Sequence, residues 1–134
     1  MRILFTAIMA CVFPLLAYSG TFTYECTIKH ELQLNSEGQL STEYTLYVGN
    51  TFNVDRKSGL VLGGGLGNST YKSRHIIDPG GKEQSYTLMW ISHPISGTSG
   101  GVHSTYLNIE EHNDNLLKPF VLIQSSSVLT GTCK

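Results

Sequence analysis

Apolar and polar residues alternate with a period of two over much of the chain that follows residue 20. Between residues 22 and 34 the odd-numbered positions are polar or charged, and the even-numbered positions carry Phe22, Tyr24, Cys26, Ile28, His30, Leu32 and Leu34. Strict alternation of this kind is typical of a β-strand with one buried face. We therefore predict a long strand whose even-numbered side chains face the core.

A second alternating run, from Leu40 to Val48, predicts the partner strand of a hairpin. Ser36, Glu37 and Gly38 suit a three-residue loop with the glycine in the left-handed conformation. This register pairs Leu34 with Leu40, His30 with Tyr44, Ile28 with Leu46, and Cys26 with Val48. His30 is then expected to be a hydrogen-bonded histidine in the core or at its rim.

Two further hairpins are predicted downstream. In the first, Phe52 and Val54 lead into a turn that begins at Asp55 and uses Gly59, and Leu60 and Leu62 lead out. Residues 63–75 lack periodicity and predict a loop, and Pro79-Gly80 predicts a turn. The other hairpin spans residues 85–111 and pairs Met89 with Leu107, Thr87 with Ile109, and Ile91 with Thr105.

The last two strands are predicted at residues 120–124 and near the C-terminus, ending at Cys133. About eight short strands and no convincing helical period indicate an all-β fold. We expect an antiparallel meander that forms a barrel, a barrel-like sheet or a sandwich. A single domain over residues 20–134 is expected at this length.

The N-terminus has the features of a secretory signal peptide. Arg2 precedes an apolar run that ends at Ala17, and Ala17-Tyr18-Ser19 fits the small-x-small cleavage pattern. The run is short for a membrane span. We predict a signal peptide over residues 1–19, cleavage after Ser19, and export to the periplasm or the medium. An uncleaved anchor is the alternative.

Cysteine usage agrees with export. Cleavage removes Cys11 and leaves Cys26 and Cys133, which should pair in an oxidising compartment. Closing so long a loop stabilises a fold by ~4–5 kcal/mol in the chain-entropy model. This link is most reasonable if the first and last strands are neighbours, as in a closed or nearly closed barrel. Two unpaired buried thiols are the alternative.

Charge and motif content exclude several classes of function. The chain has 9 Lys and Arg against 10 Asp and Glu, and no basic patch that would suit nucleic acid or an anionic membrane. The glycine-rich segment 63–70 lacks both the nucleotide-binding spacing and a following helix. We therefore expect no cofactor. Asn68-Ser69-Thr70 is a glycosylation acceptor only in a eukaryotic secretory pathway.

Catalytic and metal-binding residues are harder to find. His93 and His103 face each other in the predicted register and are weak metal candidates without a third ligand nearby. Asp78 and Glu83 flank a turn, which explains both more simply than catalysis does. No nucleophile and base pair stands out, so we predict that the protein is not an enzyme.

The predicted hairpin at 85–111 gives the best functional lead. Its polar face would carry Trp90 and Tyr106 as cross-strand neighbours, with Tyr86 and Leu88 beside them. Exposed aromatic residues favour protein interfaces, so we predict a protein partner of unknown identity. An exported enzyme that this protein inhibits is one class of partner that agrees with the prediction. The alternative for this patch is a strand pair buried on both sides.

A carrier of a small apolar ligand is the second functional hypothesis. It requires a lipocalin-like cavity lined by Tyr24, Ile28, Leu46, Met89 and Leu107. A hydrolytic enzyme is the third, and it requires an acid, a base and a nucleophile in one cleft. The oligomeric state is not predicted.

Several segments resemble a group of small exported proteobacterial proteins of unassigned function. They are Phe52 to Gly59 (F-x-V-D-R-x-[ST]-G), Gly63-Gly64, Glu83 to Tyr86, Lys118 to Phe120, and Thr130 to Cys133. This resemblance implies export and no particular activity. Tyr24-Glu25-Cys26 is also similar to the opening of the periplasmic C-type lysozyme inhibitors, which are β-barrels. Their Ser-Gly-x-x-Tyr motif is matched only by Ser99 to Val102, without the tyrosine.

Overall fold

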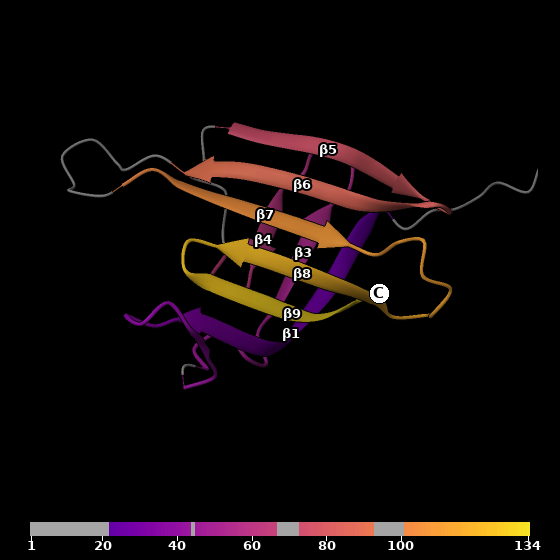
Figure 1. The fold of residues 1–134 in the computed structure, drawn as a ribbon. Helices are drawn as coiled ribbons and strands as arrows, with labels where there is room; N and C mark the ends of the chain where they lie inside the picture. Colours follow the sequence, from indigo (N-terminus) through magenta and orange to yellow (C-terminus); the bar gives the residue numbers. More distant parts are fainter. Residues whose placement is uncertain (1–21, 44, 67–72, 93–100) are drawn as a thin grey trace, which may run out of the picture.

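The computed structural model describes residues 22–43, 45–66, 73–92 and 101–134, which form an all-β fold (Figure 1). Within these residues no helix is long and apolar enough to span a membrane. The strands are β1 (Thr23–Leu34), β2 (Leu40–Ser41), β3 (Thr51–Asp55), β4 (Val61–Gly63), β5 (Ser73–Gly81), β6 (Gln84–Ser92), β7 (His103–Ile109), β8 (Lys118–Gln124) and β9 (Ser127–Cys133). The predicted signal peptide and Asn68 lie outside the described residues.

These strands belong to one antiparallel sheet in the order β4-β3-β1-β9-β8-β7-β6-β5, with β2 paired to β1 alone. Strands β5 to β9 form a meander, and β9 then pairs with β1. The sheet curls into a half-barrel, so that β3, β4 and the first part of β1 lie behind the meander in Figure 1, while the end of β1 lies beside β9. The predicted meander and the neighbouring first and last strands are both confirmed.

The disulfide between Cys26 and Cys133 is confirmed. The two residues are direct partners in the β1–β9 register, and their sulfur atoms are bonded. Both cysteines are buried, so the link lies inside the curled sheet. It closes a loop that contains nearly all of the described chain.

The concave face of the sheet is filled by a continuous apolar core. Phe52 packs edge-to-face on Phe120 with 5.3 Å between ring centroids, and the Tyr24 and Tyr86 rings are 5.4 Å apart. Trp90 is the largest fully buried side chain. The rest of the core consists of Cys26, Ile28, Val54, Val61, Leu66, Leu88, Leu107, Ile109, Leu122, Leu129 and Cys133.

The first predicted hairpin is correct only at its turn. Leu34 pairs with Leu40, and Gly38 has a φ of 79°, as predicted. The second strand ends at Ser41, however, and Cys26 pairs with Phe52 instead of Val48. Leu46 is 76% exposed, and the Gly49 and Asn50 backbones hydrogen bond with the Ile28 backbone just before the chain continues as β3. Tyr44, the predicted partner of His30, lies outside the described residues.

A β-bulge in β1 changes which side chains face the core. The register against β9 shifts between Ile28 and His30, so Lys29 is the extra residue. One added residue reverses the inward and outward positions beyond it. Glu31 therefore takes the inward position opposite Leu129, and Leu32 points outward. The prediction that His30, Leu32 and Leu34 continue the buried face is wrong.

The hairpin of β3 and β4 is confirmed at its predicted position, but its second strand buries a different residue from those predicted. Asp55 Oδ1 accepts hydrogen bonds from the backbone N–H and the hydroxyl of Ser58, and Gly59 has a φ of 69°. The buried residue of the outgoing strand is Val61, whereas Leu62 is exposed.

The predicted loop over residues 63–75 is wrong at its end. β5 begins at Ser73 and continues through Pro79 and Gly80 to Gly81. Lys82 and Glu83 form the turn into β6. A bulge between Ile76 and Asp78 obscures the alternation that would have indicated this strand.

Candidate functional site

A register shift of one residue places the residues of the predicted aromatic surface on two different faces of the sheet. Met89 pairs with Tyr106, and Leu88 pairs with Leu107. Trp90, Tyr86 and Leu88 therefore belong to the core, where each is fully buried. Of the four predicted binding residues, Tyr106 alone lies on the convex outer face. A one-residue slip moves the side chains of one strand to the other face, so the prediction exchanged the faces of β6, whereas the predicted inward Leu107 and Ile109 and outward Tyr106 of β7 are correct.

An apolar row nevertheless crosses the outer face. Met89, Tyr106, Ile123 and Val128 are successive partners across β6, β7, β8 and β9. Ile123 is 44% exposed, and Val102, just before β7, is 62% exposed. A hollow of about 300 Å³ lies here, lined by Met89, Val102, His103, Ser104, Thr105, Tyr106, Ile123 and Ser125.

A hydrogen-bonded pair lies where this hollow reaches the start of β7 and the end of β8. The Ser125 hydroxyl is 3.0 Å from His103 Nδ1. Ser125 starts the tight turn between β8 and β9 and has a φ of 51°, which is unusual for a residue other than glycine. A second hollow of about 330 Å³ adjoins the pair and is lined by Tyr47, Ser92, His103, Gln124, Ser125, Ser127 and Leu129.

The third hollow is the largest, at about 660 Å³. Its lining residues are Glu31, Gln33, Leu34, Asn35, Ser36, Glu43, Leu46, Tyr47 and Ser127. The β1 bulge turns Glu31 and Gln33 toward the concave side, and the Tyr47 backbone N–H donates to Glu31 Oε2 over 2.9 Å. This hollow shares Tyr47 and Ser127 with the second one.

Together the three hollows form one feature, which we call the end groove. The first and second share His103 and Ser125, and the second and third share Tyr47 and Ser127. The groove lies where β1 and β8 end and β7 and β9 begin, at the left of Figure 1. It therefore runs from an apolar patch on the outer face to a carboxylate on the concave face.

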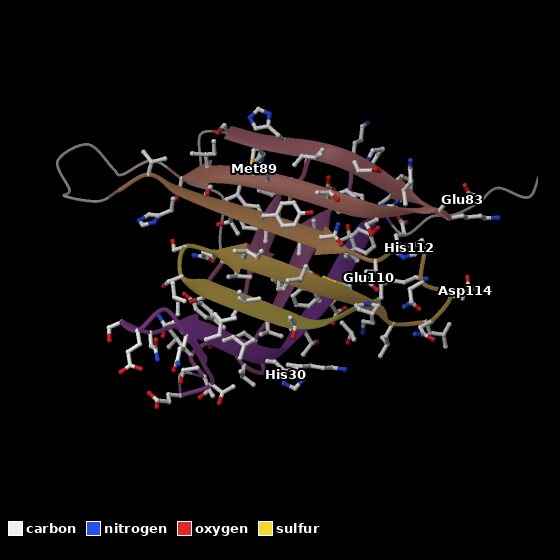
Figure 2. All side chains as sticks on the ribbon, viewed as in Figure 1. His30, Glu83, Met89, Glu110, His112 and Asp114 are labelled. Atoms are coloured by element: carbon white, nitrogen blue, oxygen red, sulfur yellow. A yellow bond between two sulfur atoms is a disulfide. The ribbon has the colours of Figure 1, made fainter. Side chains whose placement is uncertain are left out.

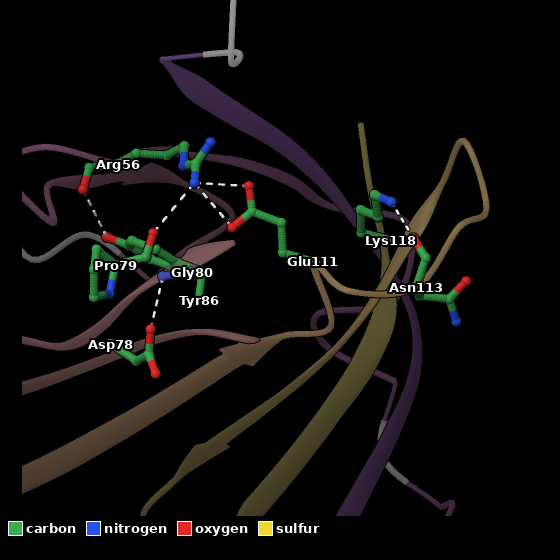
Figure 3. A network of polar contacts seen from close by, with 8 residues as sticks. All are labelled: Arg56, Asp78, Pro79, Gly80, Tyr86, Glu111, Asn113 and Lys118. Atoms are coloured by element: carbon green, nitrogen blue, oxygen red, sulfur yellow. Dashed lines mark hydrogen bonds and ion pairs between the residues drawn. The ribbon is translucent and has the colours of Figure 1, made fainter. Parts of the chain in front are cut away.

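The opposite end of the half-barrel is tied together by an ion pair (Figure 3). The Arg56 guanidinium lies 2.7 Å from Glu111 Oε1 and 2.8 Å from Oε2, and it also donates to the Pro79 carbonyl over 3.2 Å. The Tyr86 hydroxyl donates to the Arg56 carbonyl, and the Arg56 side chain lies over the Tyr24 ring. Lys118 donates to the Asn113 carbonyl nearby. We call this the closing network.

Burial raises the pKa values of the two tyrosine hydroxyls in the closing network. Burial, followed by the charge of Glu111, raises the pKa of Tyr24 above its ordinary value. Burial raises the pKa of Tyr86 to about 12, against an opposing effect of Arg56. Both hydroxyls are neutral at physiological pH, as is appropriate for side chains that complete a core.

The residues proposed to line a carrier cavity do not come together. Tyr24, Ile28 and Leu107 are packed in the core, Leu46 is exposed, and Met89 lies on the outer face. Figure 2 shows Met89 on β6, far from His112 and Asp114 at the other end of the sheet. The described residues thus fill the space in which a carrier would hold its ligand.

The structure also shows where the described catalytic and metal-binding candidates lie. His103 pairs with Ser92 in the sheet, and His93 lies outside the described residues. The described part of the chain has no group of three His, Cys, Asp or Glu that could hold a metal ion. Asp78 accepts a hydrogen bond from the Gly80 backbone N–H inside β5, so it lies in the strand and not in the predicted Pro79-Gly80 turn.

Glu31, Tyr47 and Ser125 were not identified from the sequence. Glu31 occupied a polar position of the alternating pattern, and the bulge that turns it inward has no clear signature in this sequence. Ser125 lies in a polar stretch between the last two predicted strands, where nothing in the pattern indicates its contact with His103. A scan against protein-family models finds no match, and searches of curated proteins and of solved structures find none either.

Proposed function

We propose that this protein is an exported binding domain that engages a protein partner through the end groove. An exported enzyme that is inhibited on binding is the first class of partner to test. The proposal keeps Tyr106 from the predicted aromatic surface and replaces its three buried members with Met89, Val102 and Ile123. Resemblance to small exported proteins agrees with it, although no activity comes with that resemblance.

Export is supported from two directions. The apolar N-terminus ends at a small-x-small site at Ser19, and the fold contains a buried disulfide between Cys26 and Cys133. Disulfides persist mainly in oxidising compartments. We therefore propose that residues 1–19 are removed and that the protein works in the periplasm or the medium.

The apolar row on the outer face is the observation that carries the binding proposal. Solvent-facing positions of an antiparallel sheet are normally polar. The next row on the same face is Thr87, Asn108, Val121 and Thr130, in which Val121 is the one apolar residue and Asn108 donates a hydrogen bond to Thr87. Met89, Tyr106 and Ile123 depart from this rule, and methionine and tyrosine are enriched at protein interfaces.

A capture experiment tests this proposal. The oxidised protein is immobilised and incubated with an extract of the source cell envelope, and bound proteins are quantified by mass spectrometry. We expect one dominant partner, whose recovery falls at least tenfold with Ile123→Glu because a charge then enters the apolar row. Leu62→Glu is the matched control, since Leu62 is equally exposed on β4 and lines none of the three hollows. Equal loss in both variants, or in neither, would contradict the proposal.

A further inference from the structure

Glu31 is a buried carboxylate that is poorly satisfied. Its side chain lies at an inward position of β1, and the residue is 5% exposed. Among the described residues it accepts one hydrogen bond, from the Tyr47 backbone N–H. An ionised carboxylate has about four acceptor sites, and buried polar groups are normally paired. Glu31 therefore has acceptor capacity that the described chain leaves unused.

The hollow beside Glu31 has the chemistry of a cation site. It is the largest of the three, and the described residues that line it include Glu31 and Glu43 and no lysine or arginine. Gln33 and Ser127 add further oxygen acceptors. Leu34, Leu46 and Tyr47 supply an apolar wall, of which Leu46 is highly exposed.

We propose that this hollow binds a lysine or arginine side chain of the protein partner, an inference that rests on the binding function proposed above. The cationic group pairs with Glu31, and Glu43 adds a second negative charge. The aliphatic stem lies along Leu46 and Tyr47, because long cationic side chains bury their methylene groups while their charge remains hydrogen-bonded. A charge-assisted hydrogen bond to a carboxylate that is largely shielded from water, as that of Glu31 is, is stronger than one at an open surface.

The test uses small peptides in place of the partner. Ac-Gly-Lys-Gly-NH2 and Ac-Gly-Arg-Gly-NH2 are titrated into the oxidised protein, and backbone amide shifts are followed by NMR. Ac-Gly-Nle-Gly-NH2 has an apolar chain of similar length and is the uncharged control. The Tyr47 amide reports on the site directly because it donates to Glu31. We expect it to shift saturably with both cationic peptides and not with the norleucine peptide.

Two variants test whether the carboxylate of Glu31 binds the cationic side chain. Glu31→Gln preserves size and an oxygen acceptor for Tyr47, and it should weaken binding of the lysine peptide at least tenfold. Glu110→Gln makes the same change on an exposed residue at the opposite end of the sheet (Figure 2), and it should leave binding unchanged. If Glu31→Gln does not fold, Glu43→Gln replaces it and should weaken binding several-fold. Equal binding by wild type and the groove variants, or no saturable shift with either cationic peptide, would overturn the inference.

The peptide experiment tests the cation site and the capture experiment tests the protein interface, so either proposal can be refuted without the other. Peptide binding without any captured partner would refute the proposed protein interface and leave the cation site standing. A partner that is lost with Ile123→Glu and retained with Glu31→Gln, together with absent peptide binding, would refute the cation site alone.

Discussion

At the scale of single residues, Gly131 shows how tightly β9 packs against its neighbours. A Cβ atom built at this position would collide with the Thr27 carbonyl oxygen on β1 and lie 2.8 Å from Cε1 of Phe120. The colliding atoms belong to a backbone carbonyl and a packed ring, so neither can move without disturbing the core. The glycine in Thr130-Gly131-Thr132-Cys133 is therefore required by the close approach of β1.

We predict that Gly131→Ala destabilises the protein by about 1–3 kcal/mol or more, the range for overpacked cores. Urea unfolding followed by tryptophan fluorescence measures the change. Gly81→Ala is the control, because a Cβ atom at Gly81 would meet nothing within 4 Å. Its effect should remain within about 0.5 kcal/mol. Equal effects of the two substitutions would show that the β1–β9 contact is looser than described.

The buried phenols predict a loss of stability at alkaline pH. The pKa of Tyr24 is raised and that of Tyr86 reaches about 12, against an ordinary value of 10.0. The folded state therefore favours the neutral phenols, so their contribution is complete below pH 10 and is lost as the pH rises through about 12.

Melting temperatures measured between pH 9 and 12 test this prediction. The wild type should fall steeply above pH 10, and the double variant Tyr24→Phe/Tyr86→Phe should fall less over the same interval. Parallel curves would show that other groups control the alkaline transition.

At the scale of elements, the segment from Phe52 to Gly59 serves the framework. Phe52 and Val54 enter the core, Asp55 organises the turn, and Arg56 reaches Glu111 after β7. A Cβ atom at Gly59 would lie 2.7 Å from Leu88 Cδ1, so the turn also packs against β6. The segment from Phe52 to Gly59 thus contributes to the core and the closing network and lies away from the end groove.

We predict that Glu111→Gln destabilises the protein by about 1–3 kcal/mol, because hydrogen bonds to charged groups contribute in this range when partly buried. The side chains of Arg56 and Glu111 are 22% and 15% exposed. Glu25→Gln breaks the ion pair with Lys134, whose side chains are 52% and 64% exposed, and should cost less than about 1 kcal/mol.

Chemical denaturation of both variants measures the difference between the two ion pairs. An Arg56→Met/Glu111→Gln double variant completes the cycle with Arg56→Met and isolates the energy of the pair. Equal effects of Glu111→Gln and Glu25→Gln would contradict a closing role for the network.

The sequence predicted the framework better than the surface. Alternation and turn residues predicted the sheet class and most strands, although β5 was missed, and cysteine usage predicted the Cys26–Cys133 link. Two local features were not visible: the Lys29 bulge that turns Glu31 inward, and the one-residue shift that buries Trp90 and exposes Met89. Both sides of this hairpin carry apolar residues, so the pattern alone could not distinguish its faces. The candidate site depends on these two features, so it had to be found in three dimensions.

At the scale of the whole molecule, the two ends of the half-barrel differ in kind. The closing network joins the β3–β4 turn, β5 and the segment after β7 through Arg56. The end groove combines three joined hollows, an apolar row on the outer face and the buried carboxylate of Glu31, whereas a polar hollow of about 310 Å³ lies beside Glu111 and Lys118 at the other end. The disulfide holds β1 and β9 together at the end of β9 that lies away from the groove. Our central claim is that one end maintains the fold and the other end binds.

Hydrogen exchange of the protein, alone and with the partner it retains, tests that claim most directly. The account predicts slower amide exchange on complex formation at residues 31–35, 45–48, 103–106 and 123–127, with no change at residues 55–59 and 110–118. Protection centred on residues 55–59 and 110–118, with the groove segments unchanged, would contradict it.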